Sequence, residues 1–219
     1  VMARLEAVLS PEERTRGNRF LSAKDRVLFV AAHGALRDIL GSYLGREPAD
    51  IGLEEGSRGK PRMREEEDHW LKFNLSHTRG RALVAVARDR VVGVDIEHLE
   101  RDTDHAGVVA HFFSPTEQAA WTALPDAGRA AGFFRLWTAK EAYVKARGDG
   151  LEHPSSRYTM SLASDQEGAL LVDELSPEAP GHWTVQALPV DGGYVASLAS
   201  AGDRPRVVMH AWHAAGLEI

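Results

Sequence analysis

Two side chains in the stretch from residue 137 to residue 145 could act together in phosphoryl chemistry. Glu141 and Lys145 stand at positions i and i+4, a spacing that points both side chains to the same side of a helix. A carboxylate can hold a cation and an ammonium can contact a phosphate, so the pair suits phosphoryl chemistry if further carboxylates join it. The ordinary alternative for this spacing is a solvated ion pair on a helix surface.

Further carboxylates are present in the segment 91–97, which has the pattern of a strand. Side chains alternate along a strand, so Asp95 and Glu97 share one face while Val94 and Ile96 take the other. Two like charges so close repel each other, and a bound cation relieves that repulsion. Together with Glu141 they would offer three oxygen donors suited to Mg²⁺. Two solvated acids at a strand end are the alternative.

Three other features could contact a phosphate, although each has an ordinary explanation. His77 ends a predicted strand, where a histidine is more often packed than bound to a ligand. Lys60 lies in a predicted loop, where most lysines face water. A basic cluster across the first helical region has the pattern of a solvated helix face; its members are Arg14, Arg16, Arg19, Lys24 and Arg26.

Composition limits the class of protein. The chain has 219 residues, 43% hydrophobic and 26% charged, which predicts a globular protein of one domain or two small lobes. We identify no run of about 18 apolar residues and no secretory signal, so we expect a cytoplasmic protein without a membrane partner. The absence of cysteine excludes disulfides and thiolate zinc sites. The net charge of −6 argues against a nucleic-acid partner.

The order of elements predicts an α+β protein with two similar lobes, residues 1–98 and 99–219, joined near 97–104. Ser10-Pro11-Glu12-Glu13 and Ser114-Pro115-Thr116-Glu117 each combine an N-cap serine with a glutamate three positions on, so each begins a helix. Capping explains Glu117 locally, so we assign it no catalytic role, and the sequence leaves open whether it is more than a cap. Longer helices follow at 24–44 and 127–147. Strands at 71–75, 82–87 and 91–97 would form an antiparallel meander, and 62–69 an exposed loop. Further strands are predicted at 157–162, 169–172, 183–188, 194–199 and 207–212.

A set of motifs in this order closely resembles the 4′-phosphopantetheinyl transferases of the surfactin-synthetase type. Each motif is modest alone, and the resemblance spans about residues 10–151. The motifs are Gly59-Lys60-Pro61, Phe73-Asn74-Leu75-Ser76-His77, Gly93-Val94-Asp95-Ile96-Glu97, Phe112-Phe113-Ser114-Pro115-Thr116-Glu117 and Trp137-Thr138-Ala139-Lys140-Glu141-Ala142-Tyr143-Val144-Lys145.

The resemblance implies a monomer of two pseudo-equivalent lobes, each a small antiparallel sheet packed with helices, with coenzyme A bound in the cleft between them. Such an enzyme moves the phosphopantetheine arm of coenzyme A to a serine of an apo acyl or peptidyl carrier protein and releases 3′,5′-ADP. The carrier would dock transiently on the second lobe, beside the helix 127–147 and near Leu151.

The resemblance also implies roles for single residues. Mg²⁺, or Mn²⁺ in its place, would be held by Asp95, Glu97 and Glu141. Glu141 would also act as the base for the serine, and Lys145 would neutralise the phosphate under attack. The nucleotide would be gripped by Lys60, Ser76, His77 and Arg16, and Lys24 or Arg26 could replace Arg16, because the basic pattern at 23–29 departs from that of the family.

Two other classes of function compete with this interpretation. One is a catalytically silent module that binds coenzyme A or carrier proteins, which would not need three acids and Lys145. The other is a metal-dependent nuclease, which commonly has an acid-x-lysine spacing on one strand. His98 and Leu99 follow Glu97 in this sequence, so that spacing is absent.

Overall fold

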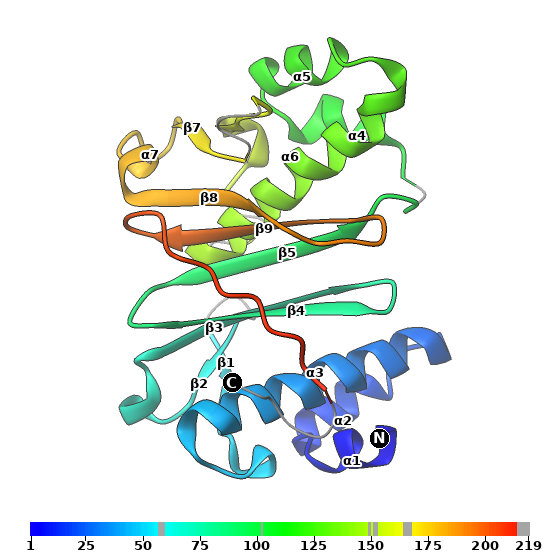
Figure 1. Ribbon diagram of the computed structural model, residues 1–219, viewed down its shortest axis with the longest axis vertical. Helices are drawn as coiled ribbons and strands as arrows, with labels where there is room; N and C mark the ends of the chain where they lie inside the picture. The colour runs from blue at the N-terminus through cyan, green and yellow to red at the C-terminus, as the bar shows by residue number, and fades with distance from the viewer. Residues whose placement is uncertain (57–59, 102, 149, 151–152, 164–167, 214–219) are drawn as a thin grey trace.

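Helices pack against several small antiparallel sheets in the computed structural model, which describes residues 1–56, 60–101, 103–148, 150, 153–163 and 168–213. The predicted α+β class is confirmed. Figure 1 shows the N-terminal helices at one end of the molecule, the later helices at the other end, and strands between them.

The N-terminal end is built from α1 (Met2–Ala7), α2 (Pro11–Gly17) and α3 (Ala23–Leu44). The capping box that starts α2 is confirmed, because the Ser10 side chain accepts from the backbone of Glu13 and the Glu13 side chain accepts from the backbone of Ser10. The short strands β1 (Leu53–Glu55) and β2 (Pro61–Met63) and the 3₁₀ turns at Pro48–Asp50 and Glu66–Asp68 follow α3. The prediction of an exposed loop at 62–69 was therefore wrong in part: Met63 and Asp68 are buried, and Asp68 pairs with Arg46.

Helix α3 is long and apolar enough to cross a membrane by length and composition, a property that the sequence analysis did not identify. Of its most apolar window, 56% is buried inside the protein. The buried side chains Leu36 and Leu40 pack with Ile51, Leu71 and Phe73. The core of the first domain therefore accounts for the apolar character of this helix.

Strands β3 (Leu71–Thr78) and β4 (Arg81–Arg88) form the predicted antiparallel hairpin, whereas β5 (Val92–His98) does not continue it. Strand β5 pairs with β9 (Tyr194–Ala201), which also pairs with β8 (Trp183–Leu188). The predicted three-stranded meander was thus wrong for β5. A division at residue 98 assigns β5 to the first lobe, but its backbone hydrogen bonds join it to the second.

Strands β3 and β5 lie side by side (Figure 1), and side chains of β3 join them. The Asn74 side chain accepts from the backbone N–H of Val94 at 2.8 Å, and Ser76 Oγ accepts from that of Ile96 at 3.4 Å. The partners advance in the same direction along both strands, so β3 and β5 run parallel. Side chains of β3 therefore take the place of a backbone ladder at the junction of the two halves.

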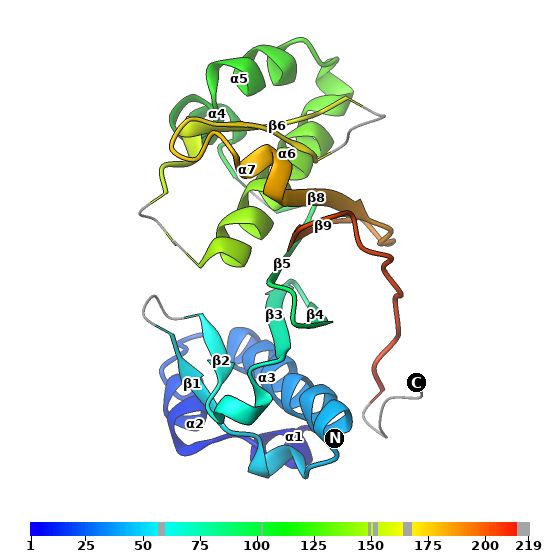
Figure 2. The same cartoon turned by 90° about the vertical axis from the view of Figure 1, so that its left-hand side faces the viewer.

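The second half contains α4 (His105–Phe112), α5 (Pro115–Thr122), α6 (Asp126–Arg147), β6 (Tyr158–Met160), β7 (Leu170–Asp173) and α7 (Ala179–His182), with a 3₁₀ turn at Ser155–Arg157. Helix α4 was not predicted. Residues 207–212, predicted as a strand, form no strand in the structure; they leave the sheet after β9 and run toward the N-terminal helices (Figure 2).

Helix α6 lies directly on β5, and Gly93 allows this close approach. A Cβ atom at Gly93 would lie 2.2 Å from the carbonyl oxygen of Ala142 and 2.3 Å from the backbone nitrogen of Ala146. A side chain there would push the helix away from the strand. Gly93 therefore sets the separation between the strand that carries Asp95 and Glu97 and the helix that carries Glu141 and Lys145.

Candidate active site

Three elements bring Asp95, Lys145 and Ser76 into direct contact. Lys145 Nζ lies 2.6 Å from Asp95 Oδ1, and the Ser76 hydroxyl donates to the same oxygen at 2.8 Å. Lys145 also donates to Ser76 Oγ at 3.0 Å. Ser76, predicted as a nucleotide contact, is buried and positions the other two residues.

Glu97 and Glu141 complete a group of carboxylates that influence one another. Glu97 pairs with Arg101 and accepts from the Thr78 hydroxyl at 3.0 Å. Burial raises the pKa of Glu97, and the charge of Asp95 adds to this rise. Burial likewise raises the pKa of the half-buried Glu141, followed by the charge of Asp95. The sequence prediction did not identify Thr78, which directly follows the motif that ends at His77, or Arg101, which stands four positions after Glu97.

Whether these carboxylates fit Mg²⁺ depends on their free oxygens. Among the described residues, no three acidic, histidine or cysteine side chains are arranged around one point as metal ligands. Lys145 and Arg101 instead neutralise Asp95 and Glu97. Asp95 Oδ2, however, is buried and has no hydrogen-bond partner within the described part of the chain. A buried oxygen without a partner is costly, and a hard cation with carboxylate ligands would satisfy it, so the donor set fits Mg²⁺.

His77 of β3 feels the charges of basic side chains from α2, α3 and α6 and of one acidic side chain, Asp25 of α3. Burial lowers the pKa of His77, and the nearby charges of His33, Lys145 and Arg16 lower it further. A group of positive or protonatable side chains around a half-buried histidine favours an anionic ligand. Arg16 and Lys145, both predicted as phosphate contacts, therefore act electrostatically on the same histidine.

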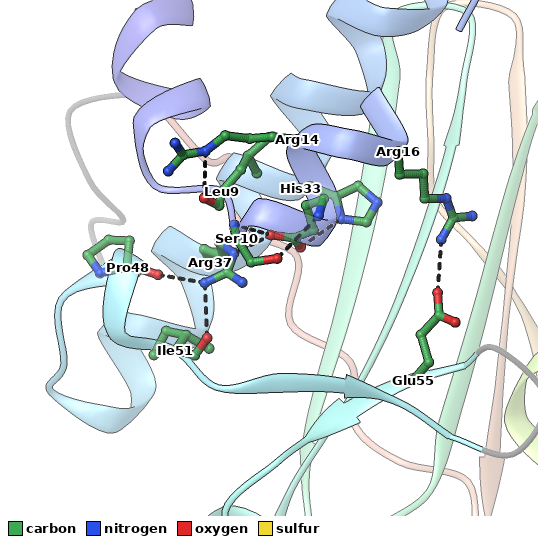
Figure 3. A network of polar contacts seen from close by, with 10 residues as sticks. Leu9, Ser10, Arg14, Arg16, His33, Arg37, Pro48, Ile51 and Glu55 are labelled. Carbon is green, nitrogen blue, oxygen red and sulfur yellow. Dashed lines mark hydrogen bonds and ion pairs between the residues drawn. The ribbon is translucent and has the colours of Figure 1, made fainter. Parts of the chain in front are cut away.

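His33 belongs to this group, although the sequence analysis did not single it out. Its Nδ1 lies 3.1 Å from Glu13 Oε1, and its ring stacks on Phe29 with centroids 4.0 Å apart. Arg37 also binds Glu13, at 2.7 Å, and donates to the carbonyls of Pro48 and Ile51 (Figure 3). Phe29, His33 and Arg37 are spaced at i, i+4 and i+8 on α3, a pattern from which this shared face could have been predicted.

The ion pair that Arg16 forms is weak, whereas Arg26, one of its two predicted substitutes, is engaged in a shorter pair. Arg16 lies 3.5 Å from Glu55, and both side chains are largely exposed (Figure 3), so the pair contributes little, typically about 0.2–1 kcal/mol. Arg26 pairs with Glu6, and Lys24 is exposed on the first turn of α3. Arg16 is therefore the better candidate for a phosphate contact.

Lys60 has a different environment from the one predicted. Its ammonium donates to the carbonyl oxygens of Val92 at 3.0 Å and Ala146 at 3.3 Å. Burial, with a smaller effect of Lys72, lowers the pKa of Lys60 to about 8. Lys60 thus ties β5 to α6, and it lines a cavity of about 360 Å³ together with Lys72 and Arg147. Gly59 of the same motif lies outside the described residues, as does Leu151.

Glu117 is more than the helix cap that the sequence predicted. It completes the capping box with Ser114, and both of its oxygens also accept from Lys140, at 2.8 and 2.7 Å. Lys140 further donates to the carbonyl of Tyr158 at 2.7 Å, and the whole pair is buried. Lys140, which precedes Glu141 in the sequence, therefore anchors α6 on α5 and β6.

Comparison with known protein families gives two matches that together span most of the chain. The family described as "4′-phosphopantetheinyl transferase, N-terminal" matches residues 2–89, and the 4′-phosphopantetheinyl transferase superfamily matches residues 91–199. The two matches meet just before β5, which agrees with the pairing of that strand to the second half.

Individual relatives extend this finding. The chain is 39% identical over 199 residues to 4′-phosphopantetheinyl transferase HetI of Nostoc sp., covering 90% of this chain and 81% of the relative. It is 25% identical over 198 residues to 4′-phosphopantetheinyl transferase Sfp of Bacillus subtilis, covering 90% and 84%. A solved structure of a Chronobacterium ammoniagenes ACPS-CoA complex aligns with a TM-score of 0.39 and 20% identity, over 53% of this chain and 98% of that chain.

These matches cover both halves of the chain and include the segments that carry Asp95, Glu97, Glu141 and Lys145. The resemblance identified from the motifs is therefore confirmed. The chain belongs to the 4′-phosphopantetheinyl transferase superfamily, with the two-domain organisation of the Sfp type, and is an enzyme that transfers phosphopantetheine to carrier proteins.

Proposed function

We propose that coenzyme A is the donor and that the acceptor is a serine hydroxyl of an apo acyl or peptidyl carrier protein. The serine oxygen would form a new bond to the phosphorus that bears the pantetheine arm. The bond from that phosphorus to the bridging oxygen of the pyrophosphate would break, and 3′,5′-ADP would leave. The observation that carries this proposal is the convergence of Asp95, Glu141 and Lys145 from β5 and α6 in a chain of this family.

The charged side chains would divide the work of this reaction. Glu141 would take the serine proton, and its raised pKa improves it as a base. Lys145 would neutralise the phosphate under attack and the leaving group. Asp95, Glu97 and Glu141 would hold Mg²⁺, which supplies charge neutralisation to the pyrophosphate when bound.

The nucleotide end of coenzyme A would lie on the first lobe, in a cleft between two pseudo-equivalent lobes. Arg16, His33 and His77 would contact its 3′-phosphate: the Arg16 guanidinium carries a permanent positive charge, and a histidine ring N–H can donate a hydrogen bond to a phosphate oxygen. The internal similarity is supported by α3 and α6, which are each 22 residues long and end at a left-handed glycine, Gly45 and Gly148. A capping-box helix also precedes each of them. One chain would supply the whole site, so we propose that the enzyme acts as a monomer.

Mass spectrometry of apo carriers tests the proposal. Fatty-acid, polyketide and nonribosomal-peptide carriers are incubated separately with the enzyme, Mg²⁺ and coenzyme A. We expect at least one carrier to gain one phosphopantetheinyl group, with an equal amount of 3′,5′-ADP, and a chelator to abolish the gain. Binding of coenzyme A with no modification of any carrier would favour the silent module. Cleavage of DNA without modification would favour the nuclease.

A further inference from the structure

The segment that follows β9 forms a strap between the second domain and the N-terminal helices. After β9, residues 203–213, here named the C-terminal strap, run past β5 and β4 toward α1–α3 (Figures 1 and 2). Two hydrogen bonds fix its start: Arg90 donates to the carbonyl of Asp203, and Arg204 donates to the Gln186 side chain, both at 2.6 Å. The strap therefore begins firmly attached to the second domain.

Trp212 is the apolar anchor at the far end of the strap. It packs against the buried cluster Leu5, Leu9, Phe29 and Val30. The middle of the strap is held less closely: Val208 is 59% exposed and Met209 is 44% exposed, and a cavity of about 1180 Å³ lies between the strap, α3 and β4. The buried Nε1 of Trp212 has no partner among the described residues, so its apolar contacts hold the ring in place.

Phe29, a member of that cluster, supports the basic side chains near His77. His33 stacks on the Phe29 ring, and the Arg16 guanidinium lies 5.7 Å from the ring centroid. On another side, a Cβ atom at Gly17 would lie 3.3 Å from Phe29 Cδ1, so α2 packs closely on the ring. A shift of Phe29 would therefore move His33 and α2, which carries Arg16.

We propose that Trp212 is a positioning residue for the nucleotide end of coenzyme A, acting through the Phe29 cluster on His33 and Arg16. The inference rests on the proposed function, in which these side chains contact the 3′-phosphate. It adds that the C-terminal strap, which starts in the second domain, fixes the phosphate-binding wall of the first. We expect loss of the anchor to leave Asp95, Glu141 and Lys145 in place, since they lie on β5 and α6 and Asp95 and Lys145 hold each other.

The test compares Trp212→Ala with Trp212→Phe and with Val208→Ala, a change at an exposed strap position. KM and kcat are measured at saturating carrier with coenzyme A and with dephospho-coenzyme A, which has no 3′-phosphate. We expect Trp212→Ala to raise KM for coenzyme A about tenfold, equivalent to about 1.4 kcal/mol, with a smaller rise for dephospho-coenzyme A and little change in kcat. Trp212→Phe should restore most of the loss, and Val208→Ala should behave as wild type.

Thermal unfolding identifies variants that do not fold. If Trp212→Ala is one of them, Trp212→Leu takes its place, and it too should raise KM for coenzyme A more than KM for dephospho-coenzyme A. Equal rises in KM for both coenzymes, a fall in kcat alone, or no change would overturn the positioning role. Arg16→Ala and His77→Ala separate this failure from failure of the proposed site. If they raise KM for coenzyme A and the Trp212 variants do not, only the positioning role fails. If Arg16→Ala and His77→Ala also leave KM for coenzyme A unchanged, the proposed nucleotide site itself is wrong.

Discussion

The two carboxylate oxygens of Asp95 have different surroundings. Oδ1 accepts from Ser76 and Lys145, whereas Oδ2 is buried and unpartnered within the described residues. A protein that needed Asp95 only to hold Lys145 could leave Oδ2 in contact with water or a donor. The unsatisfied oxygen therefore indicates a ligand-binding function for this residue in addition to its ion pair.

Asp95→Asn tests that function, because the substitution keeps the shape and removes the charge. We expect kcat/KM to fall by two or more orders of magnitude, a loss of at least about 2.7 kcal/mol in transition-state stabilisation. The far-UV circular dichroism spectrum should be unchanged. Asp191→Asn, at a side chain 89% exposed on the surface, is the matched control and should retain wild-type activity. Near-normal turnover of the Asp95 variant would remove this residue from the metal site.

Helix α6 combines a structural face and a chemical face in consecutive residues. Lys140 points into the protein and is buried against Glu117, whereas Glu141 and Lys145 lie with the carboxylates of β5. Removing one partner of a buried ion pair leaves the other charge buried and alone, which typically costs about 3–5 kcal/mol. The strength of this anchor therefore determines how well the active-site face is positioned.

We expect Lys140→Met to lower the free energy of unfolding by about 3–5 kcal/mol, because Glu117 keeps its buried charge. The double variant Glu117→Gln with Lys140→Met removes both charges and should recover most of that loss. Urea unfolding measures both changes. Arg157→Ala, which breaks a half-exposed pair with Glu174, is the control and should cost less than about 1 kcal/mol. Similar losses for the single and double variants would contradict this account.

Lys60 allows a test of the contact between β5 and α6 through pH. Burial lowers its pKa from 10.5 to about 8 in the folded protein. Between these values the unfolded chain holds a proton that the folded protein has released, so the stability contributed by Lys60 rises with pH across this window. The unfolding free energy of wild type should therefore rise relative to that of Lys60→Met from about pH 8 to about pH 10.

Lys24→Met, at an exposed lysine on α3, is the control for this measurement. The difference in unfolding free energy between Lys24→Met and wild type should not change over the same pH range. A constant difference for Lys60→Met as well would show that the Lys60 ammonium keeps an ordinary pKa. In that case its hydrogen bonds to Val92 and Ala146 would outweigh its burial.

Elements with local signals were predictable from the sequence, and those that depend on distant partners were not. Helices α2 and α5 carry their capping boxes within four residues. Strand β5 was recognised as a strand, but its partner β9 follows far along the chain, so the hairpin pattern indicated the wrong neighbour. Residues 207–212 have a strand pattern, but they pair with no strand in the part of the chain that the structure describes. Lys60 matched a motif, yet no pattern could predict that its ammonium binds two carbonyls.

At the scale of the whole molecule, the net charge of −6 limits how a carrier protein can dock. An acidic carrier would gain nothing from overall attraction, so docking must depend on a local apolar contact. Phe112 offers one near the predicted docking region. Phe113 is fully buried, whereas Phe112 is 46% exposed and packs edge-on against Trp137 of α6. Ser155 donates to the carbonyl of Phe112, which links it to the segment after α6.

Phe112→Asp should therefore raise KM for the carrier about tenfold, a loss of about 1.4 kcal/mol, because small transient interfaces often depend on one apolar anchor. KM for coenzyme A should not change, since Phe112 contacts none of the basic residues around His77. Leu171→Asp, at a side chain 42% exposed on β7 of the same domain, introduces the same charge elsewhere and should leave both constants unaltered. Steady-state kinetics with each substrate varied in turn measures KM for the carrier and KM for coenzyme A in both variants. If the Phe112 variant behaves like the Leu171 variant, or if carrier-induced NMR shifts occur only in residues 2–89, the carrier docks on another surface and the second-lobe prediction is wrong.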